Sequence, residues 1–246
     1  MRILLLDIET APNIGHVWGL WQQNISLNQL MESGYVLCWS AKWLGEDWIY
    51  FDSVQKKSTK SMLKGIYKLL DEADAVVHYN GKKFDIPTLN GEFIKSGYKP
   101  PSPYKQLDLL ETVRSQFRFP SNKLEYVSKA LGIGEKLKHT GHELWVGCMI
   151  GDPQCWETME DYNVQDVKLL EDLYMILRPW IKNHINYSLY SDDSFVCPNC
   201  GSVHLVKRGL YKTIHSIFQR YKCTSCGKWC KDNKILNRQQ YKTTGI

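Results

Sequence analysis

An unbroken apolar run near the start of the chain ends in two carboxylates, in the stretch LLLDIET at residues 4–10. The run predicts a strand from Arg2 to Asp7 that is apolar enough to be central in a sheet. Side chains alternate between the faces of a strand, so Asp7 and Glu9 should point the same way. Two hard oxygen donors at the end of a central strand suit Mg²⁺ or Mn²⁺. For this motif alone, a solvated pair just past the strand end remains an alternative.

Strand-like and helix-like segments alternate along most of the remaining sequence. Apolar patterns and turn residues predict strands at 38–44, 48–53, 75–79 and 106–110, and helices at 58–72, 84–96, 123–131 and 157–181. The order is three strands, a helix, a strand and a helix, followed mainly by helices. This order predicts an α/β protein.

Two further stretches carry acids that could join the first pair. Asp85 lies in HYNGKKFDIPTL, after a buried strand and a glycine turn and at the start of a helix. Asp166 lies in DYNVQDVKLL, four residues after Tyr162, a spacing that puts both side chains on one face of a helix. Each acid also has an ordinary interpretation. Asp85 could stabilise the helix dipole, and Asp166 could face water on an amphipathic helix.

Taken in order, the three stretches resemble the three motifs of a known enzyme superfamily. DIET at 7–10, NGKKFD at 80–85 and YNVQD at 162–166 resemble the motifs of the DEDD, or DnaQ-like, 3′–5′ exonucleases. The last motif resembles the branch with tyrosine, and NGKKFDIPTL looks most like the YprB-type and DNA polymerase B-type groups. The resemblance covers roughly residues 1–184. It implies a ribonuclease H-like mixed β-sheet flanked by helices.

The resemblance also implies roles for individual residues. Asp7, Glu9, Asp85 and Asp166 would bind two Mg²⁺ or Mn²⁺ ions, and Tyr162 would orient or deprotonate the attacking water. Two metals suit this reaction, because hydrolysis of a phosphodiester needs an activated water and a neutralised leaving oxygen. A free tyrosine is a poor base at neutral pH, so a metal must first lower the pKa of the water.

Four of the eight cysteines form paired knuckles near the end of the chain. CPNCG and CTSCG give the spacing C-x₂-C, 22 residues, C-x₂-C, which is close to a structural zinc pattern. The segment resembles a zinc ribbon holding one Zn²⁺ through Cys197, Cys200, Cys223 and Cys226. Cys230 is a spare that could replace Cys226. We expect a nuclease domain at 1–185, a linker at 186–195, and the ribbon with a basic tail at 196–246.

Charge is unevenly distributed between these regions. Residues 197–246 contain ten Lys or Arg and one acid, so this segment carries about +9 and the rest of the chain about −4. Such asymmetry suggests nucleic-acid binding, although a solubilising tail is an alternative. The residues expected to contact nucleic acid are Thr10, Asn80, Lys207, Arg208, Lys212, Arg220, Lys222 and Lys228. His78, Asp108, Glu111, His139 and His142 are weaker candidates near the site, and Trp18, Trp21, Trp39 and Trp43 are candidates for base stacking.

The sequence is that of an ordinary globular chain, 43% hydrophobic and 23% charged. It has no apolar run long enough to span a membrane and no secretory signal, so we expect a cytoplasmic protein without membrane contact. The predicted function is hydrolysis of single-stranded nucleic acid from its 3′ end, with DNA favoured over RNA. A polymerase or another replication or repair protein is a candidate partner in trans. A non-catalytic nucleic-acid-binding adaptor and a structure-selective endonuclease remain alternatives.

Overall fold

The computed structural model describes residues 1–193 and 195–238, which form two compact units. One unit comprises Arg2–Tyr174, and the other comprises Met1 with Met175–Ile246. Ser194 of the predicted linker and residues 239–246 of the predicted basic tail lie outside the described residues. The predicted domain boundaries at 185 and 196 stay predictions. Within the described part, no helix combines the length and the apolar character needed to cross a membrane.

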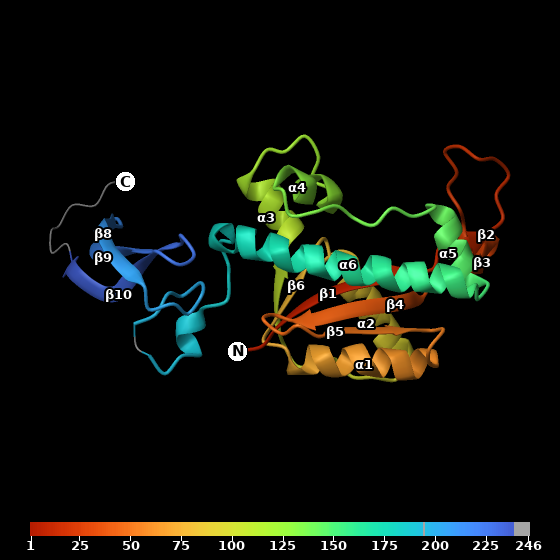
Figure 1. The fold of residues 1–246 in the computed structure, drawn as a ribbon, viewed down its shortest axis with the longest axis horizontal. Helices are drawn as coiled ribbons and strands as arrows, with labels where there is room; N and C mark the ends of the chain where they lie inside the picture. The colour runs from red at the N-terminus through yellow and green to blue at the C-terminus, as the bar shows by residue number, and fades with distance from the viewer. Residues whose placement is uncertain (194, 239–246) are drawn as a thin grey trace. The chain divides into compact units, whose positions relative to one another are not determined.

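A five-stranded mixed sheet forms the centre of the larger unit (Figure 1). The strand order is β5-β4-β1-β6-β7, so β1 (Ile3–Thr10) is the middle strand, as its apolar run predicts. Strand β4 (Val36–Trp43) pairs antiparallel with β1, and β6 (Ala75–His78) pairs parallel with it. The outer strands are β5 (Ile49–Ser53), antiparallel to β4, and β7 (Lys105–Asp108), parallel to β6.

The two faces of β1 have different partners. Leu4, Leu6 and Ile8 are buried on one face, in a core with residues of α1 (Thr59–Glu72) and α2 (Asp85–Lys95). Residues Leu5, Asp7 and Glu9 therefore belong to the opposite face, which is crossed by the long helix α6 (Pro153–Leu177) (Figure 1). This face is where polar side chains of β1 and α6 meet. The predicted α/β class with a mixed sheet between helices is confirmed.

Several predicted element bounds differ from the structure. The strand predicted to end at Leu110 ends at Asp108, because the Asp108 carboxylate accepts a 3.0 Å hydrogen bond from the Leu110 amide and caps a new helix. That helix, α3 (Leu109–Gln116), and α5 (His142–Met149) were not predicted. Nor were the short strands β2 (Ile14–Gly15) and β3 (Leu30–Glu32) or the 3₁₀ helix η1 (Leu27–Gln29). Helix α4 (Leu124–Ala130) matches its prediction closely, whereas α6 starts four residues early, at Pro153.

The smaller unit contains a three-stranded antiparallel sheet in the order β10-β9-β8. Its strands are β8 (Leu205–Lys212), β9 (Ser216–Cys223) and β10 (Trp229–Arg238). Two 3₁₀ helices precede them, η2 (Arg178–Trp180) and η3 (Tyr187–Leu189). The second of these lies inside the segment predicted as a linker.

Candidate active site

Helix α6 brings a third carboxylate to the pair on β1. Carboxylate oxygens of Asp7, Glu9 and Asp166 all lie within 4.8 Å of one another. Asn163, which is fully buried, donates a 2.7 Å hydrogen bond from Nδ2 to Oδ2 of Asp7 and so fixes that carboxylate. Asn163 was not predicted, although it lies within the YNVQD motif beside Tyr162.

Burial and mutual repulsion disfavour the charged forms of these acids. Burial, followed by the negative charges of Asp166, Asp85 and Glu9, raises the pKa of Asp7 well above its usual value. The pKa of Glu9 rises to about 8 for the same reasons, with burial first and Asp166 next. Burial also raises the pKa of Asp166, although the neighbouring Lys136 opposes that rise. A divalent cation among these oxygens would remove the repulsion.

The donor set fits a divalent metal ion. All of the donors are carboxylate oxygens, which Mg²⁺ and Mn²⁺ prefer. Oδ1 of Asp166 is buried and has no hydrogen-bond partner among the described residues. A buried carboxylate oxygen without a partner is costly unless something binds it.

We expect Mg²⁺ to stabilise the protein more at pH 8 than at pH 5. The pKa of Glu9 is about 8 in the folded protein and near 4.5 in the unfolded chain. Between pH 4.5 and pH 8, the folded protein therefore binds more protons than the unfolded chain does. Without divalent ions, the free energy of unfolding should therefore fall as pH rises through that window. Bound Mg²⁺ should reverse the loss, raising the melting temperature by about 5 °C at pH 8.

Thermal melting at both pH values, with and without millimolar Mg²⁺, tests this expectation. The variant Asp166→Asn should lose most of the stabilisation at pH 8, because one ligand is gone. An equal effect of Mg²⁺ at the two pH values would contradict a metal site at these three carboxylates.

Asp85 lies beside this group but has a different partner. It begins α2, and its Oδ1 accepts a 3.3 Å hydrogen bond from the Ile8 amide of β1. Burial raises its pKa to about 7. Asp85 is not among the three acids whose oxygens lie within 4.8 Å of one another, so its role as a metal ligand stays a prediction.

Asp108 shapes the turn that leads to Asp85. Its carboxylate accepts hydrogen bonds from the amides of Asn80 at 2.9 Å and Lys82 at 3.3 Å. This holds Asn80 in a left-handed conformation with φ of 70°. Nδ1 of the fully buried His78 lies 3.6 Å from the same carboxylate. The two weaker candidates Asp108 and His78 therefore support the turn, rather than joining the acidic cluster.

Lys136 is a site residue that sequence reasoning missed. Its Nζ donates a 2.9 Å hydrogen bond to the Tyr162 hydroxyl and forms an ion pair with Asp166. Burial disfavours the Lys136 charge, but Asp166 and Tyr162 outweigh it and raise the pKa of the lysine. The pKa of Tyr162 is also raised, by burial and then by Asp166. The hydroxyl therefore stays protonated at neutral pH.

Aromatic residues pack beside the tyrosine. The ring centroids of His139 and Trp145 lie 4.9 Å and 6.0 Å from that of Tyr162. His139 is thus brought next to the acidic cluster, whereas His142 is exposed at the start of α5. Glu111 is exposed and pairs with Lys82 at 2.5 Å.

A cleft of about 560 Å³ opens beside the acidic cluster. Asp7 and Lys136 line one part of it, and α3, α4 and the segments around them line the rest. Its other polar lining residues are Tyr79, Asn80, Arg114, Asn122, Lys123 and Glu125. The cleft thus places cationic side chains beside the carboxylates. Thr10, the other predicted substrate contact in this unit, is half-buried at the end of β1.

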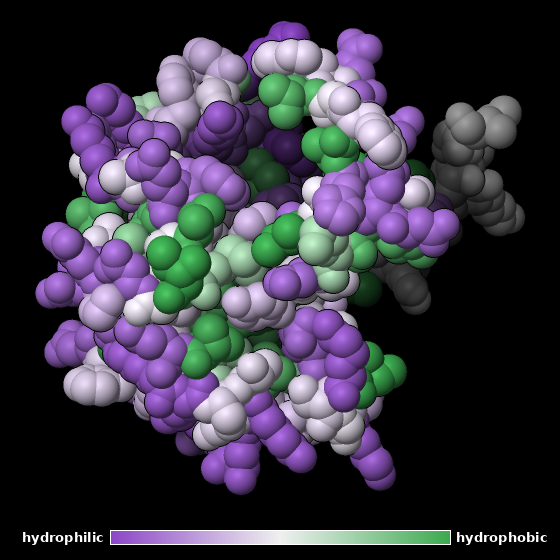
Figure 2. Space-filling view, turned by 90° about the vertical axis from the view of Figure 1, so that its right-hand side faces the viewer, coloured by the Kyte–Doolittle hydropathy of each residue, from purple (hydrophilic) through white to green (hydrophobic). Residues whose placement is uncertain are grey.

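The four tryptophans predicted as stacking candidates divide into two kinds. Trp39 and Trp43 are buried in the core and cannot stack on a base. Trp18 and Trp21 are 97% and 84% exposed in the segment that joins β2 to β3. Figure 2 views the side of the molecule that bears this segment and shows hydrophobic residues scattered among hydrophilic ones.

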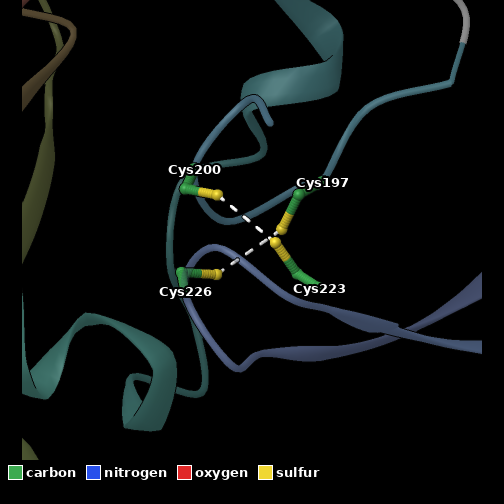
Figure 3. Close-up of side chains that lie close together, drawn as sticks. All are labelled: Cys197, Cys200, Cys223 and Cys226. Atoms are coloured by element: carbon green, nitrogen blue, oxygen red, sulfur yellow. Dashed lines mark hydrogen bonds between the residues drawn. The ribbon is translucent and has the colours of Figure 1, made fainter. Parts of the chain in front are cut away.

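In the smaller unit, the four predicted cysteines converge (Figure 3). Their sulfur atoms lie within 4.8 Å of one another, with 3.7 Å between Cys197 and Cys226 and between Cys200 and Cys223. A tetrahedral zinc ion with Zn–S bonds of about 2.3 Å requires sulfurs about 3.8 Å apart. Cys230 is not one of the four.

The knuckles also favour a thiolate at Cys223. Burial opposes its charge, but the backbone amides of Cys226 and Ser225 outweigh this and lower its pKa to about 7. Since zinc binds thiolates and not thiols, this prepares the group for metal. The geometry and the donor chemistry are both compatible with a structural zinc ribbon.

Comparisons with known proteins agree with the fold. Residues 46–178 match a family model described as RNase_H superfamily, a range that includes Asp85, Tyr162 and Asp166 but starts after Glu9. No curated protein matches the sequence. The structure is similar to that of the family B DNA polymerase from the hyperthermophilic archaeon Pyrobaculum calidifontis, with a TM-score of 0.57 and 16% sequence identity. That match covers 87% of this chain and 31% of the polymerase, and at this identity it shows a shared fold alone.

Proposed function

Because the chain belongs to the RNase H superfamily, we propose that it is a metal-dependent nuclease that removes nucleotides from the 3′ end of single-stranded nucleic acid. The observation that carries this proposal is the meeting of Asp7, Glu9 and Asp166 beside the Tyr162 hydroxyl, at the edge of a cleft. A structural role alone would not explain three neighbouring carboxylates with raised pKa values, one of which is buried and has an oxygen without a hydrogen-bond partner among the described residues.

In this proposal, Asp7, Glu9, Asp85 and Asp166 hold two Mg²⁺ or Mn²⁺ ions. Bound there, the ions would supply a water of lowered pKa and stabilise the charge that develops on the leaving oxygen. The Tyr162 hydroxyl orients the attacking water. Nζ of Lys136 donates a 2.9 Å hydrogen bond to that hydroxyl and so fixes its position. The same ammonium group adds a positive charge next to the phosphate that is attacked.

The cleft favours attack at a strand end. Its volume of about 560 Å³ is within the range of small-ligand pockets, so it suits terminal nucleotides better than a duplex. Arg114 and Lys123 line it and would contact the backbone phosphates, while Asn80 would contact the nucleotide nearest Asp7. We favour DNA as the substrate. The fold shared with a family B DNA polymerase is compatible with a replication partner that acts in trans.

The ribbon would assist by holding the strand. Its four cysteines would bind one structural Zn²⁺, and the basic residues of 197–246 would contact phosphates. Two of the predicted contacts already have backbone partners at 2.8 Å: Nζ of Lys228 donates to the carbonyl of Ile181, and Nε of Arg220 donates to the carbonyl of Arg208. Arg220 keeps the terminal nitrogens of its guanidinium for a phosphate, whereas Nζ is the single charged nitrogen of Lys228. Lys228 is therefore the weaker of these two predicted phosphate contacts.

A digest of 5′-labelled oligonucleotides tests the proposed reaction. Matched DNA and RNA strands, single-stranded and duplex, are incubated with Mg²⁺ or Mn²⁺ and resolved at single-nucleotide resolution. We expect a ladder that shortens stepwise from the 3′ end of the single strands. One internal cut would identify an endonuclease, and binding without cleavage would identify an adaptor.

The variant Tyr162→Phe should slow hydrolysis by about 10²- to 10⁴-fold, because it removes a group that positions the water. The phenyl ring retains the packing against His139 and Trp145, so folding should be unaffected. Single-turnover rates with saturating Mg²⁺ measure the effect, and Tyr126→Phe, on the exposed surface of α4, serves as the control. A normal rate for Tyr162→Phe would make the tyrosine structural only.

A further inference from the structure

One face of the ribbon sheet combines aromatic and cationic side chains. Residues that pair directly across antiparallel strands share a face, as do alternate residues along one strand. The pairs Tyr211 with Phe218, Arg220 with Lys231, and Lys222 with Trp229 therefore belong together. We call these six residues the aromatic–basic face: Tyr211, Phe218, Arg220, Lys222, Trp229 and Lys231.

Contacts within this face interleave the cations with the rings. The guanidinium of Arg220 lies 4.8 Å from the centroid of the Trp229 ring, and Nζ of Lys222 lies 5.8 Å from it. Nζ of Lys231 lies 3.7 Å from the centroid of Phe218. Despite these contacts, Trp229 and Tyr211 remain 49% and 44% exposed. Each offers ring surface beside a positive charge.

The other face supplies the small core of the ribbon. Tyr221, which alternates with Arg220 and Lys222 along β9, is buried and packs edge-on against Phe195 at 5.0 Å between centroids. Asp232, the one acid of residues 197–246, interacts with Tyr221. The rings of Trp229 and Tyr211 are therefore not needed to fill that core. Both rings are large apolar groups that remain about half exposed to solvent.

We propose that the aromatic–basic face is a binding site for unpaired nucleotides, which stacks bases on Trp229 and Tyr211 and binds the adjoining phosphates through Arg220, Lys222 and Lys231. This combination of ring surfaces and a cationic track is what sequence-independent single-strand binding requires. A duplex hides its bases from such a face and offers only phosphates. The inference deepens the proposed function and rests on it, since it makes the ribbon select the single-stranded substrate.

Binding measurements on the full chain test this site. Fluorescence anisotropy with a 5′-labelled 20-nucleotide DNA strand, and with the matching duplex, is recorded in the Asp166→Asn background to prevent degradation. Trp229→Ala should weaken single-strand binding about 5- to 150-fold, which corresponds to one lost stacked base. Duplex affinity should change less than about twofold. Trp48→Ala is the matched control, since Trp48 is 68% exposed in the other unit.

The zinc content of each variant shows whether weaker binding results from a lost contact with the strand or from unfolding of the ribbon. Each variant should retain its zinc, and Tyr211→Ala provides a second test of stacking should Trp229→Ala lose the metal. Lys231→Gln should reduce the slope of log affinity against log salt by about 1, through one lost phosphate contact.

Unchanged single-strand affinity in both ring variants would overturn the proposal. An equal loss for single strand and duplex would also overturn it, by making the face a general phosphate surface or a contact for another protein. A failure of the nuclease proposal is distinguishable, because wild-type protein would then bind the strand through this face without shortening it.

Discussion

Asp166→Ala and Asp7→Ala should each reduce hydrolysis by about 10³-fold or more, because each removes an oxygen donor from a site whose metal ions stabilise the developing charge by several kcal/mol. Asp166 contributes both its ion pair with Lys136 and its unpartnered Oδ1. Asp7 interacts with all three other acids, because its pKa is raised by burial first and then by the negative charges of Asp166, Asp85 and Glu9. The expected loss is therefore in rate and in metal affinity together.

The fold should survive these changes. Removing one of several repelling carboxylates relieves repulsion in the metal-free protein. This gain offsets the loss of the Lys136 ion pair in Asp166→Ala and of the Asn163 hydrogen bond in Asp7→Ala, so the melting temperature without Mg²⁺ should change little. Asp161→Ala on the exposed side of the same helix is the control and should cleave normally. Initial rates on a labelled single strand, across a range of Mn²⁺ concentrations, measure the effect. Full activity in Asp166→Ala would rule out the proposed site.

The position of Asp7 and Glu9 could be predicted because strands alternate strictly. The unbroken apolar run before Asp7 predicts a central strand, and the period of two then determines which side chains share a face. The spacing of Tyr162 and Asp166 is equally regular, because residues four apart share a helix face. On the strand and on the helix alike, local backbone geometry alone determines which side chains share a face.

Lys136 could not be predicted in the same way. It lies between α4 and α5 in a segment without regular structure, and Lys138 is only two residues away. No periodicity tells which lysine of such a segment reaches the site. The choice depends on how the segment packs against α6, where Tyr162 and Asp166 provide a hydroxyl and a carboxylate for a cation.

The same limit applies to the capping residue Asp108. The sequence predicts that Asp108 lies within a strand at 106–110 and makes it a weaker candidate near the active site. Its carboxylate instead receives three amide hydrogen bonds, from Asn80, Lys82 and Leu110. Two of these donors lie almost thirty residues away, at the turn after β6, so only the parallel pairing of β6 with β7 reveals the contact. Capping residues with distant partners are not visible in a linear pattern.

The largest effect on stability should come from the cysteines. Cys223→Ser should lower the zinc content from about one ion per chain to almost none, because a structural tetrahedral site needs all four ligands. Zinc binding contributes about 10–16 kcal/mol to the folding of small zinc domains. A ribbon of about fifty residues has too little core to fold without that contribution. Residues 196–238 should then become sensitive to limited proteolysis, which mass spectrometry can map.

Cys230→Ser is the matched control for this variant. Cys230 lies on β10, opposite Tyr221, and is not one of the four converging cysteines. Its substitution should leave both the zinc content and the proteolytic pattern unchanged. If Cys230→Ser loses the metal, Cys230 rather than Cys226 completes the site.

The variant Cys223→Ser should destabilise the ribbon but have little effect on the hydrolysis of short substrates. The acidic cluster lies within Arg2–Tyr174, and the cysteines lie in the other compact unit. Short substrates that fill only the cleft should therefore be cleaved at a near-normal rate. Long strands should bind more weakly and with a shallower dependence on salt, because the cations of the unfolded ribbon displace fewer counterions from the phosphates.

A chain ending near Asp193 should behave in the same way as Cys223→Ser. Loss of short-substrate cleavage in both proteins would mean that the ribbon takes part in the chemistry.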